Sequence, residues 1–410
     1  MTPRAQELHE NLSEFLCKEV YPAEAVYFDQ IHSQGPHTQP PILEELKEKA
    51  RSRGLWNLAM PHATRWNDAV PNLDYAPLAE LTGRSPMLAP EALNCSAPDT
   101  GNMELLAMFG TDEQQEKWLK PLLAGEIRSS YVMTEPDVAS SDASNIATTI
   151  ERDGDEYVVN GRKWWITGIA RDRCKILLLL GVSEPSADRH RRHSVVLIPR
   201  DTPGVTIVRD LHVFGEDPWE SHAEVRFDNV RVPATNLLGG PGGGFAMAQA
   251  RLGPGRIHHC MRQIGCAERA LELMVARAEE RTTFGTTVVD QGVIREAIAL
   301  SRMEIDQARL YTLYTAWLMD TVGNSAAMGE ISGIKVAVPR MAQRVIDRAI
   351  QVFGGAGVSE DTPLAHMYAL ARITRIADGP DDVHLRGLAR TELKRQHERR
   401  DPVASAPYRR

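Results

Sequence analysis

Residues 156–168 read EYVVNGRKWWITG, and this stretch decides the fold class. Two valines are followed by Asn160-Gly161 and then by an aromatic run, a pattern that predicts a β-hairpin turning at Asn160-Gly161. More β-branched segments, separated by Pro, Gly and Asp, follow along the chain: SVVLIPR (194–200), GVTIVRD (204–210) and AEVRFDNVRVP (223–233). We therefore expect the middle of the chain to consist mostly of strands.

The apolar spacing on both sides of this region is helical. Before it, apolar residues step by three and four from Leu8 to Leu16, and Thr111, followed by two acids, predicts the start of a helix. After the glycine cluster 239–244, helical spacing returns in four long stretches, roughly 245–281, 291–322, 330–354 and 363–399. Strands between two runs of helices indicate the α+β class, and we predict three domains: residues 1–127, 128–237 and 238–410.

The charge balance restricts the partners. The chain has 410 residues, with 47 Lys+Arg against 55 Asp+Glu and a formal net charge of −8. Because polyanions repel an acidic surface, we expect no nucleic-acid partner. The strongest apolar run, Ile176–Leu180, is far shorter than the ~20 residues of a membrane-spanning helix, and the N-terminal residues lack the apolar core of a signal peptide. We predict no membrane insertion and a cytoplasmic location.

No metal site is predicted. The five cysteines include no C-x-x-C pair, so neither a disulfide framework nor a cysteine zinc site is indicated. His190 with His193, and His258 with His259, lack the i, i+4 spacing of helical metal ligands, and solvated or capping histidines are the simpler interpretation. The glycine cluster 239–244 does not match G-x-G-x-x-G, so we favour a flexible connector over a Rossmann site.

Four motifs together suggest a family. The segment YVMTEPDVASSDASN (131–145) is rich in hydroxyl groups and small residues, and taken alone it is equally a turn-rich loop. Together with RTTFG (281–285), QVFGG (351–355) and IADGP (376–380), it resembles the four signature regions of the acyl-CoA dehydrogenase flavoenzymes, in the same order and at similar spacing. The resemblance implies an N-terminal helical domain, a middle β-barrel-like domain and a C-terminal four-helix bundle.

Within that family, the chain resembles most the subfamily whose animal members carry an additional kinase-like domain ahead of the dehydrogenase. Four sequence segments carry this resemblance: APDTGNM (97–103), TEPDVASSDASN (134–145), GPGRIHHCMR (253–262) and ADGPDDVH (377–384).

The family resemblance implies FAD as the cofactor and an acyl-CoA as the substrate. The residues implied to contact FAD are Tyr131, Met133, Thr134, Ser140, Trp165, Ile166, Thr167, Arg281, Phe284, Gln291, Gln351, Gly354, Gly355, Pro380 and Asp381. Those implied to contact the acyl-CoA are Ser141, Arg256 and Gly379. In this family the motifs at 281–285 and 351–355 hold the adenosine diphosphate part of FAD on a neighbouring subunit, which implies a homodimer or homotetramer.

Asp378 is implied as the base that removes the α-proton of the thioester while the β-hydride passes to FAD, which gives a trans-2-enoyl-CoA. Better-known members commonly place a glutamate here, so this side chain is one methylene shorter. The alternative interpretation is an aspartate that caps a helix before Gly379-Pro380. Asp381 and Asp382 are competing acids, more typical of a first helical turn, where the helix dipole favours them.

The resemblance implies that electrons leave through a separate electron-transfer flavoprotein. Two other functions stay open from the sequence. One is a flavin oxidase of an acyl-CoA or a nitroalkane, which would use dioxygen. The other is a non-catalytic acyl-CoA-binding or scaffold homologue.

Overall fold

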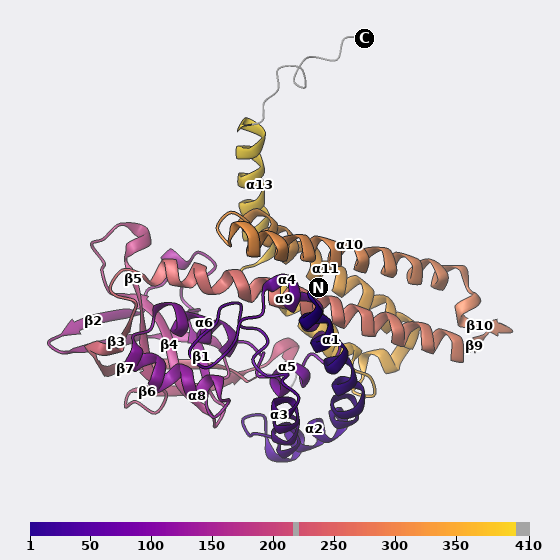
Figure 1. The fold of residues 1–410 in the computed structure, drawn as a ribbon, viewed down its shortest axis with the longest axis horizontal. Helices are drawn as coiled ribbons and strands as arrows, with labels where there is room; N and C mark the ends of the chain where they lie inside the picture. Colours follow the sequence, from indigo (N-terminus) through magenta and orange to yellow (C-terminus); the bar gives the residue numbers. More distant parts are fainter. Residues whose placement is uncertain (216–220, 399–410) are drawn as a thin grey trace, which may run out of the picture. The chain divides into compact units, whose positions relative to one another are not determined.

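The computed structural model describes residues 1–215 and 221–398, except for the side chains at positions 252 and 254. The chain forms two compact units, residues 1–269 and 270–410, and the division falls inside helix α9 (Gly244–Glu280) (Figure 1). The final stretch of the predicted C-terminal domain, 399–410, lies outside the described residues. The first unit combines helices with a sheet, and the second is mainly helical.

Helices form the N-terminal part of the first unit: α1 (Pro3–Phe15), α2 (Tyr21–Gln34), α3 (Pro41–Ser52), α4 (Asn72–Gly83), α5 (Ala89–Ala92), α6 (Asp99–Phe109), α7 (Asp112–Gln114) and α8 (Lys120–Leu123). Single π-helical turns, Leu16–Val20 and Gln115–Leu119, join α1 to α2 and α7 to α8. The predicted helix start at Thr111 is confirmed. Its hydroxyl accepts a hydrogen bond from the Gln114 N–H at 3.2 Å, and Gln114 Oε1 accepts one from the Thr111 N–H at 3.1 Å.

The middle of the chain forms an eight-stranded sheet. Its strands are β1 (Arg128–Val132), β2 (Thr149–Asp153), β3 (Glu156–Thr167), β4 (Cys174–Val182), β5 (His193–Pro199), β6 (Val205–Leu211), β7 (His222–Pro233) and β8 (Leu237–Leu238). The strand order is β6-β7-β3-β2-β4-β5-β8, and β1 pairs with β4 in parallel. Strands between two helical regions confirm the predicted α+β class.

The predicted hairpin turn at Asn160-Gly161 is wrong. β3 runs without interruption from Glu156 to Thr167, and the turn that joins β2 to β3 lies at Gly154, whose φ is +60°. Gly161 lies instead where the pairing of β3 with β7 shifts register, and a Cβ there would come within 2.3 Å of Thr148 Oγ1. The glycine is required by this close approach at an irregular position in the strand and not by a turn.

Strand β4 is buried on both faces. Its odd-numbered leucines, Leu177 and Leu179, pack into a core with residues of β3, β5 and β7. The even-numbered residues of the run Ile176–Leu180 pack into a second core with residues of α6 and α8. Burial on both faces explains why this strand reads as a continuous apolar run without alternation.

The second unit contains α10 (Gly292–Val322), α11 (Met328–Phe353), α12 (Leu364–Thr374), α13 (Asp381–Glu398) and a small hairpin of β9 (Thr282–Thr283) and β10 (Thr286–Thr287). Helix α11 packs against α10, α12 and α13. The prediction of one helix over 363–399 is wrong, because the chain leaves the helix at residues 375–380. Gly379 has a φ of +102°, and Pro380 cannot donate a helical hydrogen bond.

We expect Gly161→Ala to lower the free energy of unfolding by about 1–3 kcal/mol, because the new methyl group must displace Thr148 within a packed sheet. Urea unfolding followed by circular dichroism measures this. Gly292→Ala is the matched control, since nothing lies within 4 Å of a Cβ at that position. Equal stability of the two variants would contradict the packing assigned to Gly161.

Candidate active site

Four predicted site residues lie on the loop between β1 and β2: Met133, Thr134, Ser140 and Ser141. The Ser140 hydroxyl accepts a hydrogen bond from the Glu135 N–H at 2.9 Å, which closes a tight turn. The Ser140 hydroxyl therefore holds the conformation of this loop.

A buried ion pair fixes this loop to the sheet. Lys163 of β3 is fully buried, and its ammonium donates to the Met133 carbonyl, the Leu180 carbonyl and Glu135 Oε1, each at 2.8 Å. Burial lowers the pKa of Lys163 to about 8. Burial also disfavours the charged form of Glu135, but Lys163 and a backbone N–H of the neighbouring segment outweigh it and leave the pKa of Glu135 lowered. The pair is therefore ionised at neutral pH and joins three segments of the chain.

Trp165 adopts a backbone conformation that is rare for an aromatic residue. Its φ is +54°, and the pairing of β3 with β7 shifts register beside it. Its side chain is 38% exposed, although Ile166 next to it is buried. Thr167 Oγ1 lies 3.1 Å from His222 Nδ1, which fixes the strand beyond the distortion. Such strain persists only where the surroundings impose it, and it is typical of functional sites.

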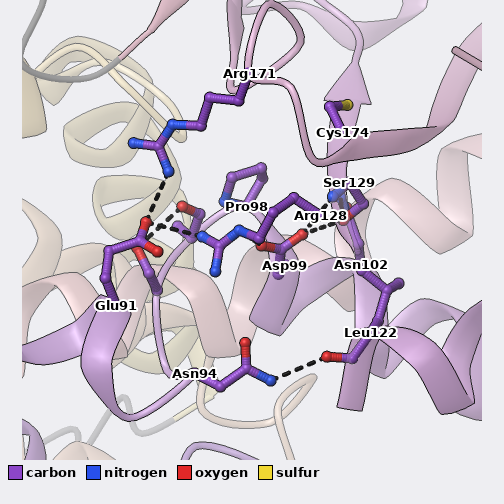
Figure 2. Close-up of polar contacts among 12 residues, drawn as sticks. Glu91, Asn94, Pro98, Asp99, Asn102, Leu122, Arg128, Ser129, Arg171 and Cys174 are labelled. Carbon is purple, nitrogen blue, oxygen red and sulfur yellow. Dashed lines mark hydrogen bonds and ion pairs between the residues drawn. The ribbon is translucent and has the colours of Figure 1, made fainter. Parts of the chain in front are cut away.

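A buried polar network supports the start of β1 (Figure 2). Arg128 lies between Glu91 of α5 (Nη2 to Oε1, 2.8 Å) and Asp99 of α6 (Nε to Oδ2, 2.6 Å). Asp99 also accepts from the Ser129 N–H at 2.7 Å, and Arg171 contacts Glu91 at 2.9 Å. Burial alone would raise the pKa of Glu91, but the two arginines lower it to about 2. The charges are therefore paired, and β1 is anchored to α5 and α6.

The network extends to Tyr131. Asn102 of α6 donates to Ser129 Oγ at 2.9 Å and accepts from Arg251 Nε of α9 at 3.1 Å. The Arg251 guanidinium carbon lies 4.2 Å from the centre of the Tyr131 ring, a cation–π contact. This predicted cofactor residue therefore packs against Arg251 of α9, and Asn102 of α6 holds that arginine in place.

Glu104 is another buried acid of α6. Its side chain is 3% exposed, and among the described residues its Oε1 has no hydrogen-bond partner. Burial raises the pKa of Glu104 to about 8, although Arg251 acts in the opposite direction. The carboxyl group is therefore mostly protonated at neutral pH.

The second unit carries the other predicted cofactor residues on exposed turns. Phe284 occupies the turn between β9 and β10 with a φ of +49°, and its side chain is 97% exposed. Arg281 stands next to this hairpin and is exposed, and Gln291 directly precedes α10. The hairpin therefore presents an exposed aromatic ring on a backbone conformation that is rare for this residue type.

Gln351, Gly354 and Gly355 lie at the C-terminal end of α11. Gln351 is exposed, and Gly354 has a φ of +66°. No atom lies within 4 Å of a Cβ built at either glycine. The backbone here is open, so a ligand can approach it closely.

Asp378 lies on the loop 375–380 between α12 and α13, half-buried, with a φ of +54°. Asp381 begins α13, as predicted for an acid of the first turn. Its side chain is buried, and its Oδ2 is contacted at 2.9 Å by Arg340 and by Arg375. Asp381 is therefore an anchor at the end of the loop.

Comparison with known proteins identifies the family. Family models match all three parts of the chain: the acyl-CoA dehydrogenase N-terminal domain (2–126), middle domain (130–230) and C-terminal domain (242–393). The chain belongs to the acyl-CoA dehydrogenase family. This confirms the predicted resemblance, and the family makes the chain an FAD-dependent oxidoreductase.

Three relatives illustrate the similarity. FadE2 of Mycobacterium tuberculosis, which carries the name probable acyl-CoA dehydrogenase, is 58% identical over 97% of both chains. Acyl-CoA dehydrogenase family member 10 of Mus musculus is 51% identical, with 98% of this chain covering 38% of that protein. Butyryl-CoA dehydrogenase of Megasphaera elsdenii has a TM-score of 0.82 at 27% identity, covering 96% of this chain and 99% of that one. The chain spans 38% to 51% of the length of the animal family members 10 and 11.

The described residues of this acyl-CoA dehydrogenase suit FAD. The partly exposed Trp165 offers an aromatic surface to a flavin ring. The Trp164 N–H donates to the Thr134 carbonyl at 3.0 Å, which brings the Thr134 segment with its hydroxyl group next to this part of β3. The exposed Arg281 is a forked cation of the kind that binds pyrophosphate, and the open glycines 354 and 355 leave space where any side chain would intrude.

The residues that hold these segments were not predicted from the sequence. Glu135 and Asp99 stand inside the quoted motifs, but nothing in the pattern separated them from solvent-exposed acids. Lys163 gave the clearer signal, because it is a charged residue within a run of strand-forming residues. Arg251 gave no signal, since its contact with Tyr131 joins residues far apart in the chain.

We expect Glu104→Gln to stabilise the protein increasingly as the pH rises from about 5 to 8. Above its ordinary pKa of 4.5 the unfolded carboxyl loses its proton, whereas the folded one keeps it until about pH 8, so the wild-type protein loses stability over this range. Glutamine has no proton to lose. The gain at pH 8 should be at least about 1 kcal/mol, since one pKa unit corresponds to about 1.4 kcal/mol.

Urea unfolding at pH 5 and pH 8 measures this gain. The exposed Glu45→Gln is the control, for which no such gain is expected. A stability difference between Glu104→Gln and the wild type that does not change with pH would show that the Glu104 pKa is not raised.

Proposed function

We propose that this chain dehydrogenates an acyl-CoA thioester to a trans-2-enoyl-CoA, with Asp378 removing the α-proton. The observation that carries the proposal is the backbone of Asp378, which is held in the left-handed region on a half-buried loop between two helices. This conformation sets the direction in which the carboxylate leaves the backbone, and a base that must meet a substrate proton in one orientation depends on such a direction. A residue held in a rare conformation supports a functional role at this place. FAD, when bound, supplies the acceptor for the β-hydride.

The proposed roles of the remaining residues follow from their chemistry. Trp165 would cover the flavin and exclude water from the hydride path. The buried Arg256 of α9 and Ser141 would bind the acyl-CoA, and the N–H of Asp378 would donate to the thioester carbonyl as negative charge develops on its oxygen. Thr134, Ser140 and Arg281 would hold the cofactor through hydrogen bonds.

Aspartate in place of glutamate is compatible with this role if the backbone supplies the missing reach. The left-handed conformation at Asp378 and Gly379 directs the chain differently from a continuing helix. We infer that this loop conformation replaces the lost methylene.

The electron acceptor is proposed to be an electron-transfer flavoprotein. No helix within residues 1–215 and 221–398 is long and apolar enough to cross a membrane.

A cytoplasmic location also remains a proposal, and it rests on five cysteines whose spacing suggests no disulfide framework.

Anaerobic bleaching of the flavin by a panel of straight, branched and hydroxylated acyl-CoAs tests the proposed reaction. At least one thioester should bleach it. Steady dioxygen consumption with substrate alone would favour an oxidase, and a flavin that no thioester bleaches would favour a non-catalytic homologue.

We expect Asp378→Asn to slow flavin reduction by at least about 10²-fold, the lower end of what a positioned base supplies, while FAD and acyl-CoA binding persist. Stopped-flow absorbance measures the reduction rate. Asp382→Asn is the matched control, because Asp382 is an exposed acid of the same helix start. If the control loses activity while Asp378→Asn keeps it, the base has been misassigned.

An apolar stripe on α10 supports a homodimer or homotetramer. Met303, Leu310, Tyr314 and Trp317 recur at helical spacing, and each is 46% to 68% exposed. The rings of Tyr314 and Trp317 stack with centroids 6.0 Å apart, which makes the end of the stripe flat and rigid. A second copy of this helix offers a complementary apolar surface.

The division into three domains, with boundaries at residues 127/128 and 237/238, also remains a proposal.

We expect Leu310→Glu to dissociate the assembly, because a carboxylate at the centre of the stripe cannot be desolvated without a partner. If Arg281 and Gln351 bind the FAD of a neighbouring subunit, the dissociated protein should also retain less FAD. Light scattering with flavin absorbance measures both quantities. Met108→Glu, at an exposed position of α6, is the control. An unchanged mass for Leu310→Glu would contradict the assigned interface.

A further inference from the structure

The loop 375–380 leaves α12 through an unusual backbone path. The Ile373 carbonyl accepts from the N–H groups of Ile376 and Ala377, at 2.8 and 2.9 Å, which ends the helix. Two consecutive left-handed residues follow, Asp378 (φ +54°) and Gly379 (φ +102°). Carbonyl groups beyond a helix end lack helical partners, so other donors must bind them.

Lys335 of α11 supplies those donors. Its side chain is 1% exposed, and its ammonium donates to the carbonyls of Thr374, Ala377 (2.9 Å) and Gly379 (3.4 Å). A lysine ammonium has three N–H groups, which matches the three carbonyls. Its charge also lies at the C-terminal end of α12, where the helix dipole favours a cation.

The buried His384 of α13 binds the Asp378 carbonyl, which lies between the carbonyls of Ala377 and Gly379. Its Nε2 lies 3.2 Å from the Asp378 oxygen, and because a carbonyl only accepts, Nε2 must carry the hydrogen. A Cβ at Gly379 would come within 2.8 Å of the same nitrogen, so the loop has no space for a larger residue there. Three consecutive carbonyls, at Ala377, Asp378 and Gly379, are thus bound by side chains of two helices.

These bonds determine where the Asp378 N–H points. The peptide unit between Ala377 and Asp378 is planar and trans, so its N–H is directed opposite to its carbonyl. Because Lys335 binds the Ala377 carbonyl, it also sets the direction of the Asp378 N–H. The bonds to the next two carbonyls restrict the backbone from which the carboxylate extends.

We propose that Lys335 is a positioning residue of the dehydrogenation, which aligns both the carboxylate and the N–H of Asp378 with the thioester. The inference rests on the proposed function of Asp378. Lys335 contacts neither substrate nor flavin in this scheme and acts through the loop. Removing its ammonium leaves the loop three carbonyl contacts short, so the loop samples other conformations while the cofactor residues elsewhere in the chain are unaffected.

The test compares Lys335→Met, which keeps the length of the side chain and removes the donors, with Lys394→Met, which removes an exposed lysine of α13. Both variants are studied as the FAD-loaded enzyme. Lys335→Gln, which retains an amide donor, is made in parallel, so that a failure of Lys335→Met to fold leaves the question answerable. The probe is the straight-chain acyl-CoA that bleaches wild-type flavin fastest, with and without deuterium at the α-carbon.

We expect Lys335→Met to reduce its flavin at least about tenfold more slowly, since misplacement by 1 Å costs on the order of 10²-fold. FAD and acyl-CoA affinities should stay within about threefold of the wild-type values, the pattern of an interaction used only in the transition state. The α-deuterium isotope effect should rise, because proton removal becomes more rate-limiting. A purely structural role would leave this effect unchanged. The flavin reduction rate of Lys335→Gln should lie between those of the wild type and Lys335→Met.

Amide hydrogen exchange, read by mass spectrometry without any acyl-CoA, gives a second readout. Exchange in peptides covering 375–381 should accelerate in Lys335→Met and not in Lys394→Met. Unchanged exchange with an unchanged isotope effect would overturn the proposal, as would a rate loss fully matched by lost FAD affinity. If wild-type flavin is not bleached by any thioester, the proposed function fails, whereas accelerated exchange would still support the hold of Lys335 on the loop.

Discussion

An ammonium group buried away from water must have its N–H donors satisfied, and this constraint shapes both groups of candidate site residues. Lys163 and Lys335 are among the largest fully buried side chains of the described chain. Lys163 satisfies its donors with two carbonyls and a carboxylate, and Lys335 uses three carbonyls. If the surrounding backbone moved, these bonds would break and leave a buried charge without partners, which is costly. Each lysine therefore makes a nearby loop rigid.

Rigid loops of this kind explain how strained residues persist. Trp165 and Asp378 both have a φ of +54°. Asp378 lies between two carbonyls that Lys335 binds, and Trp165 lies two residues after the buried Lys163 on β3. Left-handed backbone costs of order 1 kcal/mol or more for residues of this kind, so it needs compensation from its surroundings. Asparagine and aspartate tolerate it more readily than tryptophan, so Asn57, Asn94 and Asn229 need no functional explanation. Asp378 differs from them in the bonds that Lys335 and His384 make to the carbonyls of its loop.

Acidic groups of the chain illustrate how surroundings decide the function of a residue type. Asp381 is bound by two arginines and anchors a helix start, whereas Asp378, three residues earlier, lies half-buried on the loop. Glu91 is kept ionised by arginines, and Glu104, near a single arginine, is kept mostly protonated. The number of nearby cations separates these outcomes, because burial alone raises the pKa of any carboxyl group.

The sequence by itself determined the α+β class, the order of helical and stranded regions and the four motifs that indicated the family. These depend on local hydrophobic periodicity and on short sequence motifs, both of which can be read from a single sequence. The tertiary structure decided what local rules could not. Asn160-Gly161 reads as a hairpin turn, but Gly161 lies within a strand because Thr148 approaches it there. Lys335 reads as one more residue of a helix, yet it binds a loop about forty residues further along the chain. Such contacts join residues distant in sequence, so no local pattern encodes them, and only packing of the helices brings donor and acceptor together.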